Sequence, residues 1–122
     1  MKRIILLICV AFLFSTNLMA EEFVAKRATY EKDGEKIELQ NLSGVPVFHA
    51  DFYPSERIIK IKSSAGTLIL KEGLFFYGYN GKHKGLTINA RAYIENGKIE
   101  QIVYEELDEI NNMKATISYF RK

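Results

Sequence analysis

The chain has 122 residues, of which 17 are Lys or Arg and 15 are Asp or Glu. Two of the basic residues and no acid lie in the first twenty positions, so residues 21–122 carry 15 charges of each sign. One small domain with no net charge is indicated, which argues against a protein that binds nucleic acid or an anionic membrane through its overall charge.

Residues 1–20 have the three regions of a secretory signal peptide. Two basic residues precede an apolar run from Ile4 to Phe14, and a polar stretch of small residues then leads to Ala20. The apolar run is too short for a stop-transfer helix, and no later stretch approaches the roughly 20 apolar residues that a span needs. An uncleaved N-terminal anchor is the alternative interpretation, because Leu18 rather than a very small residue precedes the end of the cleavage pattern. We predict a secreted or periplasmic protein without a transmembrane span, whose mature form begins near Glu21. Because Cys9 is the only cysteine, the mature chain would have no disulfide and no cysteine metal site.

From Phe23 onward, short segments rich in β-branched and aromatic residues alternate with turn residues about every ten positions, which is typical of an all-β meander. Asp33-Gly34 and Asn96-Gly97 are pairs that suit tight hairpins, because both central residues take positive φ. Asn80-Gly81-Lys82 is a further predicted turn, and residues 105–113 are predicted as a polar loop or a single helical turn. The predicted strands are 23–30, 36–40, 45–53, 57–62, 67–71, 74–79, 86–94, 98–104 and 114–120. We predict an all-β antiparallel meander of hairpins that forms a single small domain over 21–122.

The hairpin around Asn96-Gly97 has the clearest pattern. In its first arm apolar residues from Leu86 to Ile94 alternate with polar ones such as Asn89 and Arg91. A period of two indicates a strand with one packed face and one face in water.

No residue pattern indicates catalysis. His49 and His83 are the only histidines, and neither has a second ligand at metal-binding spacing. The adjacent acids Glu105 and Glu106 lie on one polar stretch, whereas glycosidase chemistry needs two carboxylates across a cleft. We therefore expect no catalytic residue, no metal and no bound cofactor.

Aromatic and basic side chains of the second half are the candidate binding residues. Tyrosines on the outer face of a sheet can form an interaction surface, and lysines gather between residues 57 and 84 while acids gather between 95 and 109. Core packing and solvated strand faces are the alternative interpretation of these residues. The candidates are Tyr77, Tyr79, Lys82, His83, Lys84, Tyr93 and Tyr104.

The stretch from Asn80 to Glu106, NGKHKGLTINARAYIENGKIEQIVYEE, resembles the variant MORN-like repeat of YwqK-type antitoxin components. The repeat's N-G-K, its glycine and its Y-x-E-N-G-K-I correspond here to residues 80–82, Gly85 and 93–99. That resemblance implies a stacked sheet of hairpins that acts as a non-enzymatic structural or interaction module, with a protein or an envelope surface as partner. Such arrays create surfaces rather than clefts.

A second resemblance points to the flavin-binding domain of Rnf and Nqr electron-transport subunits. Gly78, Gly81 and Gly85, followed by a strand and the Asn96-Gly97 turn, look like the glycine-rich hairpin that opens that domain. This resemblance implies, as the alternative function, an exported electron-transfer protein that binds FMN, with Lys82 or Lys84 on the phosphate. The family's S-G-A-T motif is replaced here by Met-Lys-Ala-Thr at 113–116, so we expect no flavin.

Overall fold

The computed structural model describes residues 21–64 and 66–122, and the predicted signal peptide lies outside the described residues. The described residues form nine strands and no helix, and so include no helix long and apolar enough to cross a membrane. The strands are β1 (Glu21–Lys32), β2 (Glu35–Glu38), β3 (Phe48–Tyr53), β4 (Ile58–Ser63), β5 (Gly66–Glu72), β6 (Tyr77–His83), β7 (Leu86–Glu95), β8 (Lys98–Asp108) and β9 (Met113–Arg121).

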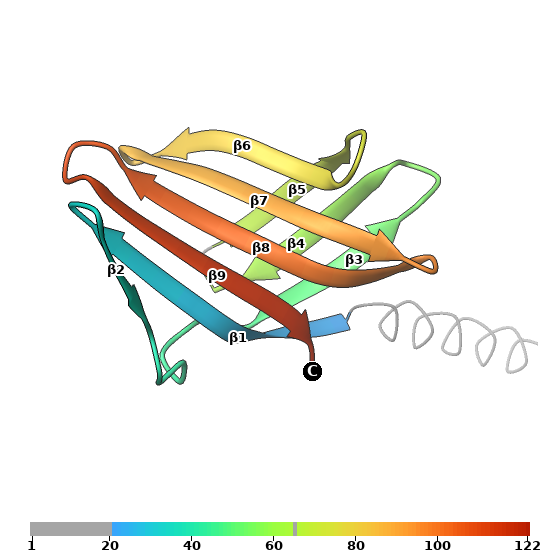
Figure 1. Ribbon diagram of the computed structural model, residues 1–122. Coiled ribbons are helices and arrows are strands. Elements are labelled where there is room, and N and C mark those ends of the chain that lie inside the picture. Colours follow the sequence, from blue (N-terminus) through green and yellow to red (C-terminus); the bar gives the residue numbers. More distant parts are fainter. Residues whose placement is uncertain (1–20, 65) are drawn as a thin grey trace, which may run out of the picture.

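The strands form one antiparallel sheet that closes on itself. Its order is β2-β1-β3-β4-β5-β6-β7-β8-β9, and β1 also pairs with β9, so that β1 and β3 to β9 close an eight-stranded barrel (Figure 1). The predicted all-β antiparallel meander is confirmed. Closure of the sheet is a feature that the sequence analysis did not predict.

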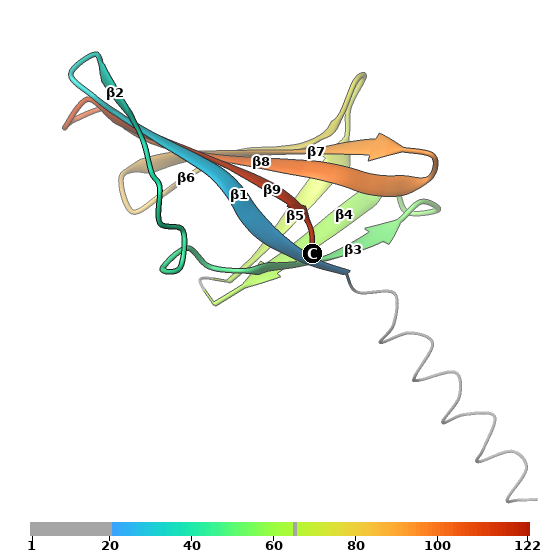
Figure 2. The ribbon, with the colours of Figure 1, turned by 60° about the horizontal axis from the view of Figure 1, so that its bottom comes forward.

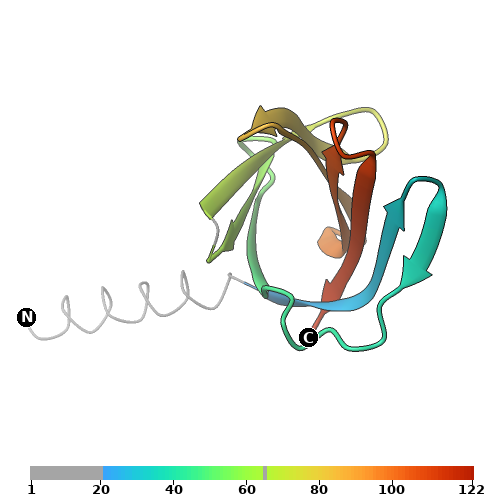
Figure 3. The same ribbon diagram turned by 90° about the vertical axis from the view of Figure 1, so that its left-hand side faces the viewer.

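β1 closes the barrel because it is long enough to serve three neighbours. Its first residues, 21–23, pair with β3, residues 23–32 pair with β9 across a bulge, and its last four residues pair with β2. β2 therefore pairs only with the C-terminal part of β1 and lies outside the ring of strands (Figure 3). A bulge bends a strand and increases its twist, which lets the two halves of β1 belong to different parts of the sheet.

Three hairpins turn on paired residues with positive φ. Asp33-Gly34 has φ values of 52° and 85°, Asn96-Gly97 has 53° and 75°, and Lys84 with Gly85 has 51° and 82°. These are the values of a type I′ turn, whose twist matches that of the flanking strands. The two predicted hairpin turns at 33–34 and 96–97 are thus confirmed.

Other predicted boundaries are wrong. Residues 80–82 lie inside β6, and the hairpin between β6 and β7 turns at 84–85 instead. The cause is the preceding turn, which lies at Leu74 and Phe75, where the Gly73 N–H donates to the Phe76 carbonyl at 2.9 Å. Residues 105–108 continue β8 rather than forming a loop or a helical turn, because they pair with β9 over 113–116. The third strand begins at Phe48 rather than at residue 45, after Pro46, which has no N–H for a ladder.

The core fills one end of the barrel, which we call the packed end and which contains the turns 53–58, 72–77 and 95–98. In Figure 2, β7, β8, β9 and β1 lie side by side across from β3, β4 and β5. Between these layers the largest fully buried side chains are those of Tyr119, Phe23, Ile59, Ile61, Leu70 and Ile102. Alternation along each strand directs every second side chain into this interior.

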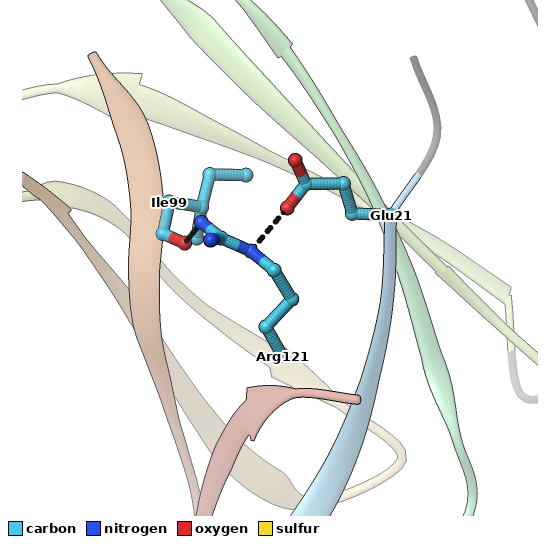
Figure 4. A network of polar contacts seen from close by, with 3 residues as sticks. All are labelled: Glu21, Ile99 and Arg121. Carbon is cyan, nitrogen blue, oxygen red and sulfur yellow. Dashed lines mark hydrogen bonds and ion pairs between the residues drawn. The ribbon is translucent and has the colours of Figure 1, made fainter. Parts of the chain in front are cut away.

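A polar contact joins both ends of the described chain to the packed end. The Arg121 guanidinium forms an ion pair with Glu21, with 2.6 Å between Nε and Oε2, and donates a second hydrogen bond to the Ile99 carbonyl (Figure 4). The last strand is thereby tied to β1 and to β8 at once. At the same end of the barrel, the Tyr77 hydroxyl donates to the exposed Glu72 carboxylate at 3.0 Å.

Candidate binding site

The other end of the barrel, where Ser63 pairs with Gly66 and which contains the turns 83–86 and 108–113, holds a cavity and is called here the open end. Its volume is about 720 Å³. Its apolar wall includes Phe48, Ile61, Leu68, Ile88 and Ile117, which reach it from five different strands. A concave, mainly apolar pocket with a few polar groups is the usual form of a small-molecule site.

Stacked aromatic rings form the wall between the cavity and the core. Phe48 stacks on Tyr119 with ring centroids 4.0 Å apart, and Tyr104 meets Phe48 edge-on at 5.7 Å. The Tyr119 side chain is fully buried, and burial, together with the nearby charge of Glu106, raises its pKa to about 12. This wall therefore stays uncharged at neutral pH.

One polar pair projects into the cavity from β8. Tyr104 and Glu106 are two residues apart and therefore share the inner face of the strand. The Tyr104 hydroxyl donates to Glu106 Oε1 at 2.7 Å. Burial and the hydrogen bond to the carboxylate raise the pKa of Tyr104 above its ordinary value of 10. The phenol is therefore held neutral as a donor, which does not suit a general base or a nucleophile at neutral pH.

A glycine shapes the wall contributed by β6. Tyr79 lines the cavity, Gly81 lies on the same face of the strand two residues further on, and a Cβ on Gly81 would lie 2.5 Å from the Tyr79 hydroxyl oxygen. The missing side chain lets the tyrosine ring lie along the strand towards the open end. His83 and Lys84, both exposed, complete this side of the cavity at its rim.

The structure brings four of the seven candidate binding residues together. Tyr79, His83, Lys84 and Tyr104 all line the cavity. The other three lie elsewhere, so the candidates do not form one outer surface of tyrosines. Tyr77 is buried in the packed end, and Lys82 is exposed on the outer face of β6. Tyr93 lies on the outer face of β7, with 5.8 Å between the centroids of its ring and that of Phe76.

Sequence reasoning missed the opposite wall of the cavity. Phe48, Glu106 and Tyr119 were not among the candidates: Phe48 and Tyr119 lie in predicted strands, and Glu106 lies in the stretch predicted as a polar loop or a single helical turn. The alternation of Phe48, Ala50 and Phe52 was a signal for one inward face. Nothing local showed that Tyr119 would face the same space.

The glycine-rich stretch does not form the turn that a flavin phosphate site would need. Gly78 and Gly81 are strand residues of β6 paired with Arg91 and Ile88, and only Gly85 lies in a turn. Thr116 lies within β9 and lines a groove of about 460 Å³ on the outside of the barrel. In that groove Arg27 forms an ion pair with Glu38 at 3.2 Å.

Within residues 21–64 and 66–122, no three His, Cys, Asp or Glu side chains gather as metal ligands. Comparison with known protein families, with curated proteins and with solved structures finds no match for this chain. The geometry of the barrel is therefore what bears on function.

Proposed function

We propose that this protein is an exported, non-enzymatic binding module that takes an apolar group of its partner into the open end of the barrel. The observation that carries this proposal is the cavity of about 720 Å³, whose walls are predominantly apolar and aromatic. Such walls suit an apolar guest, because burying apolar surface contributes roughly 25 cal/mol per Å².

The polar groups of the cavity support binding rather than catalysis. Glu106 already accepts the Tyr104 hydroxyl, and His83 and Lys84 are exposed at the rim. A general acid or base acts within hydrogen-bond reach of a positioned partner. These groups are better suited to orienting a guest than to transforming it.

Export is the second part of the proposal and rests on the leader at residues 1–20. We expect a mature chain that begins near Glu21, and mass spectrometry of the secreted or periplasmic protein tests this. Retention of Met1 in the exported species would contradict it.

The cavity is tested with N-phenyl-1-naphthylamine, an uncharged fluorophore whose emission rises in apolar surroundings. The chain has no tryptophan, so Ala115→Trp both fills the cavity and adds a single reporter to its wall. Thr116→Trp is the matched control, because the next residue of β9 lines the outer groove instead. We expect the wild type and the control to bind the probe, and Ala115→Trp to lose at least about tenfold in affinity, or about 1.4 kcal/mol.

No binding by the wild type, or equal binding by both tryptophan variants, would contradict the cavity proposal. FMN in the same titration tests the flavin alternative. A rise in melting temperature with FMN would favour that alternative, since a ligand that binds only the folded state must stabilise it.

A further inference from the structure

The barrel has one hairpin whose strands separate soon after they begin. β5 and β6 are joined by two residue pairs, Lys71 with Gly78 and Glu72 with Tyr77. Their other neighbours are paired along their whole length, with six pairs between β4 and β5 and seven between β6 and β7. We call the facing edges of residues 66–70 and 79–83 the β5–β6 seam; within the described part of the chain these edges have no strand partner.

The β6 edge of the seam presents free backbone groups. His83 and Leu86 flank the two-residue turn of the β6–β7 hairpin, so their backbone N–H and C=O groups form hydrogen bonds with each other. Because hydrogen-bonded pairs recur at every second residue, Gly81 and Tyr79 also direct their backbone groups to β7. The residues between them, Asn80 and Lys82, therefore direct their N–H and C=O groups into the seam.

The β5 edge of the seam also presents free backbone groups. Lys71 and Gly78 are a bonded pair across the hairpin, because the Gly73 N–H donates to the Phe76 carbonyl and bonded pairs recur at every second residue. Two and four residues back along β5, Ile69 and Thr67 direct their backbone groups to the same side. Two facing edges with unpaired backbone groups can accept a further strand.

The cavity lies directly beneath the seam. Leu68 of β5 and Tyr79 of β6 line it from the two edges, and so does Thr67, which is exposed. A strand in the seam would direct every second side chain into the cavity, beside Ile88 of the neighbouring β7 and towards Ile117 of β9 on the far side. Those inward positions call for apolar side chains.

The outside of the seam is basic. Between residues 58 and 84 the chain has five lysines and a single acid, Glu72, and Glu72 lies on the inner face, where it accepts the Tyr77 hydroxyl. Within the part of the chain that the structure describes, none of the five lysines forms an ion pair. Lys60 and Lys62 lie on the outer face of β4, Lys71 on that of β5 and Lys82 on that of β6, while Lys84 lies at the rim of the cavity. Outward positions of an added strand therefore call for acidic side chains.

We propose that the β5–β6 seam binds an extended peptide segment of a partner, in which apolar and acidic residues alternate, as a strand added beside β5 and β6. This rests on the proposed function, because the apolar side chains of the peptide would be the guests of the cavity. In this proposal the lysines attract the acidic side chains of the peptide. Lysines on strands more commonly shield an exposed edge from pairing with another chain.

The test uses a capped peptide of alternating glutamate and valine, about six residues long, the usual length of a strand. One control peptide has lysine in place of glutamate, and another has its alternate backbone amides methylated. We expect only the parent peptide to bind well, with each control weaker by at least about tenfold. Hydrogen exchange should slow at the amides of Thr67, Ile69, Asn80 and Lys82, and binding should weaken with added salt.

Two variants locate the site. Lys82→Glu should weaken binding of the peptide at least about fivefold, whereas Lys114→Glu, the same charge change on the exposed outer face of β9, should leave it unchanged. Ile69→Pro removes a seam donor without removing a bond to β4, and should also weaken binding.

Equal binding of the glutamate and lysine peptides, or protection at the β2 edge instead of the seam, would overturn the proposal. So would failure of the peptide to bind while N-phenyl-1-naphthylamine still does, in which case the lysines only shield the edges. Failure of both probes would overturn the cavity proposal itself.

Discussion

Truncation of Ile59 to alanine should destabilise the protein far more than truncation of Ile117, although the two changes are chemically identical. Ile59 is fully buried in the core at the packed end, whereas Ile117 is only partly buried and borders the cavity. An isoleucine exceeds an alanine by three carbons, worth about 0.8 kcal/mol each when buried, or about 2.4 kcal/mol in all.

The two sites differ in what the truncation leaves behind. At Ile59 the tightly packed core cannot collapse, and the new void adds a cavity cost, which places the loss of unfolding free energy at about 3–4 kcal/mol. At Ile117 the neighbouring space is already open, so no new void forms, and we expect a loss of about 1 kcal/mol.

Urea unfolding of the two variants and the wild type measures both losses, with equal m-values as the check that each comparison concerns stability alone. Equal losses would refute the reasoning, because they would mean that the open end is packed as tightly as the other. A loss at Ile117 above that at Ile59 would refute it more strongly.

Three further predictions follow from single positions. Because the pKa of Tyr119 is raised to about 12, its neutral form favours folding. The contribution of Tyr119 to the free energy of unfolding is complete below about pH 10 and should fall by on the order of 2 kcal/mol as pH rises towards 12. Urea titrations at alkaline pH should show a smaller fall for Tyr119→Phe. Gly97→Ala should cost about 1–2 kcal/mol in thermal unfolding, because its φ is 75°, whereas Gly44→Ala, with open space around it and no positive φ, should be nearly neutral. Arg121→Ala should cost about 1 kcal/mol at low salt and less at high salt, since its ion pair with Glu21 is partly exposed; a loss independent of salt would contradict that electrostatic origin.

Much of the local structure could be predicted from neighbouring residues. Asn96-Gly97 and Asp33-Gly34 fix their hairpins because few residues tolerate positive φ at both central positions. The alternation from Leu86 to Ile94 fixes which side chains of β7 share a face. Gly81 and Gly85 could each have formed the turn after β6, and the prediction placed that turn at Gly81 instead of Gly85. The register of β6 is set by hydrogen bonding at the preceding turn, which the residues around these glycines do not reveal.

The tertiary structure decided the rest, because it depends on residues far apart in the chain. Closure requires Phe23 to pair with Arg121 and with Phe48, and no local pattern contains that information. Closure in turn makes one side of the sheet an interior, so Tyr79 and Tyr104 face a cavity instead of an outer surface. The seam above it exists because β5 and β6 separate after two residue pairs, and the alternation of residues within either strand does not specify how many residues of its neighbour it pairs with.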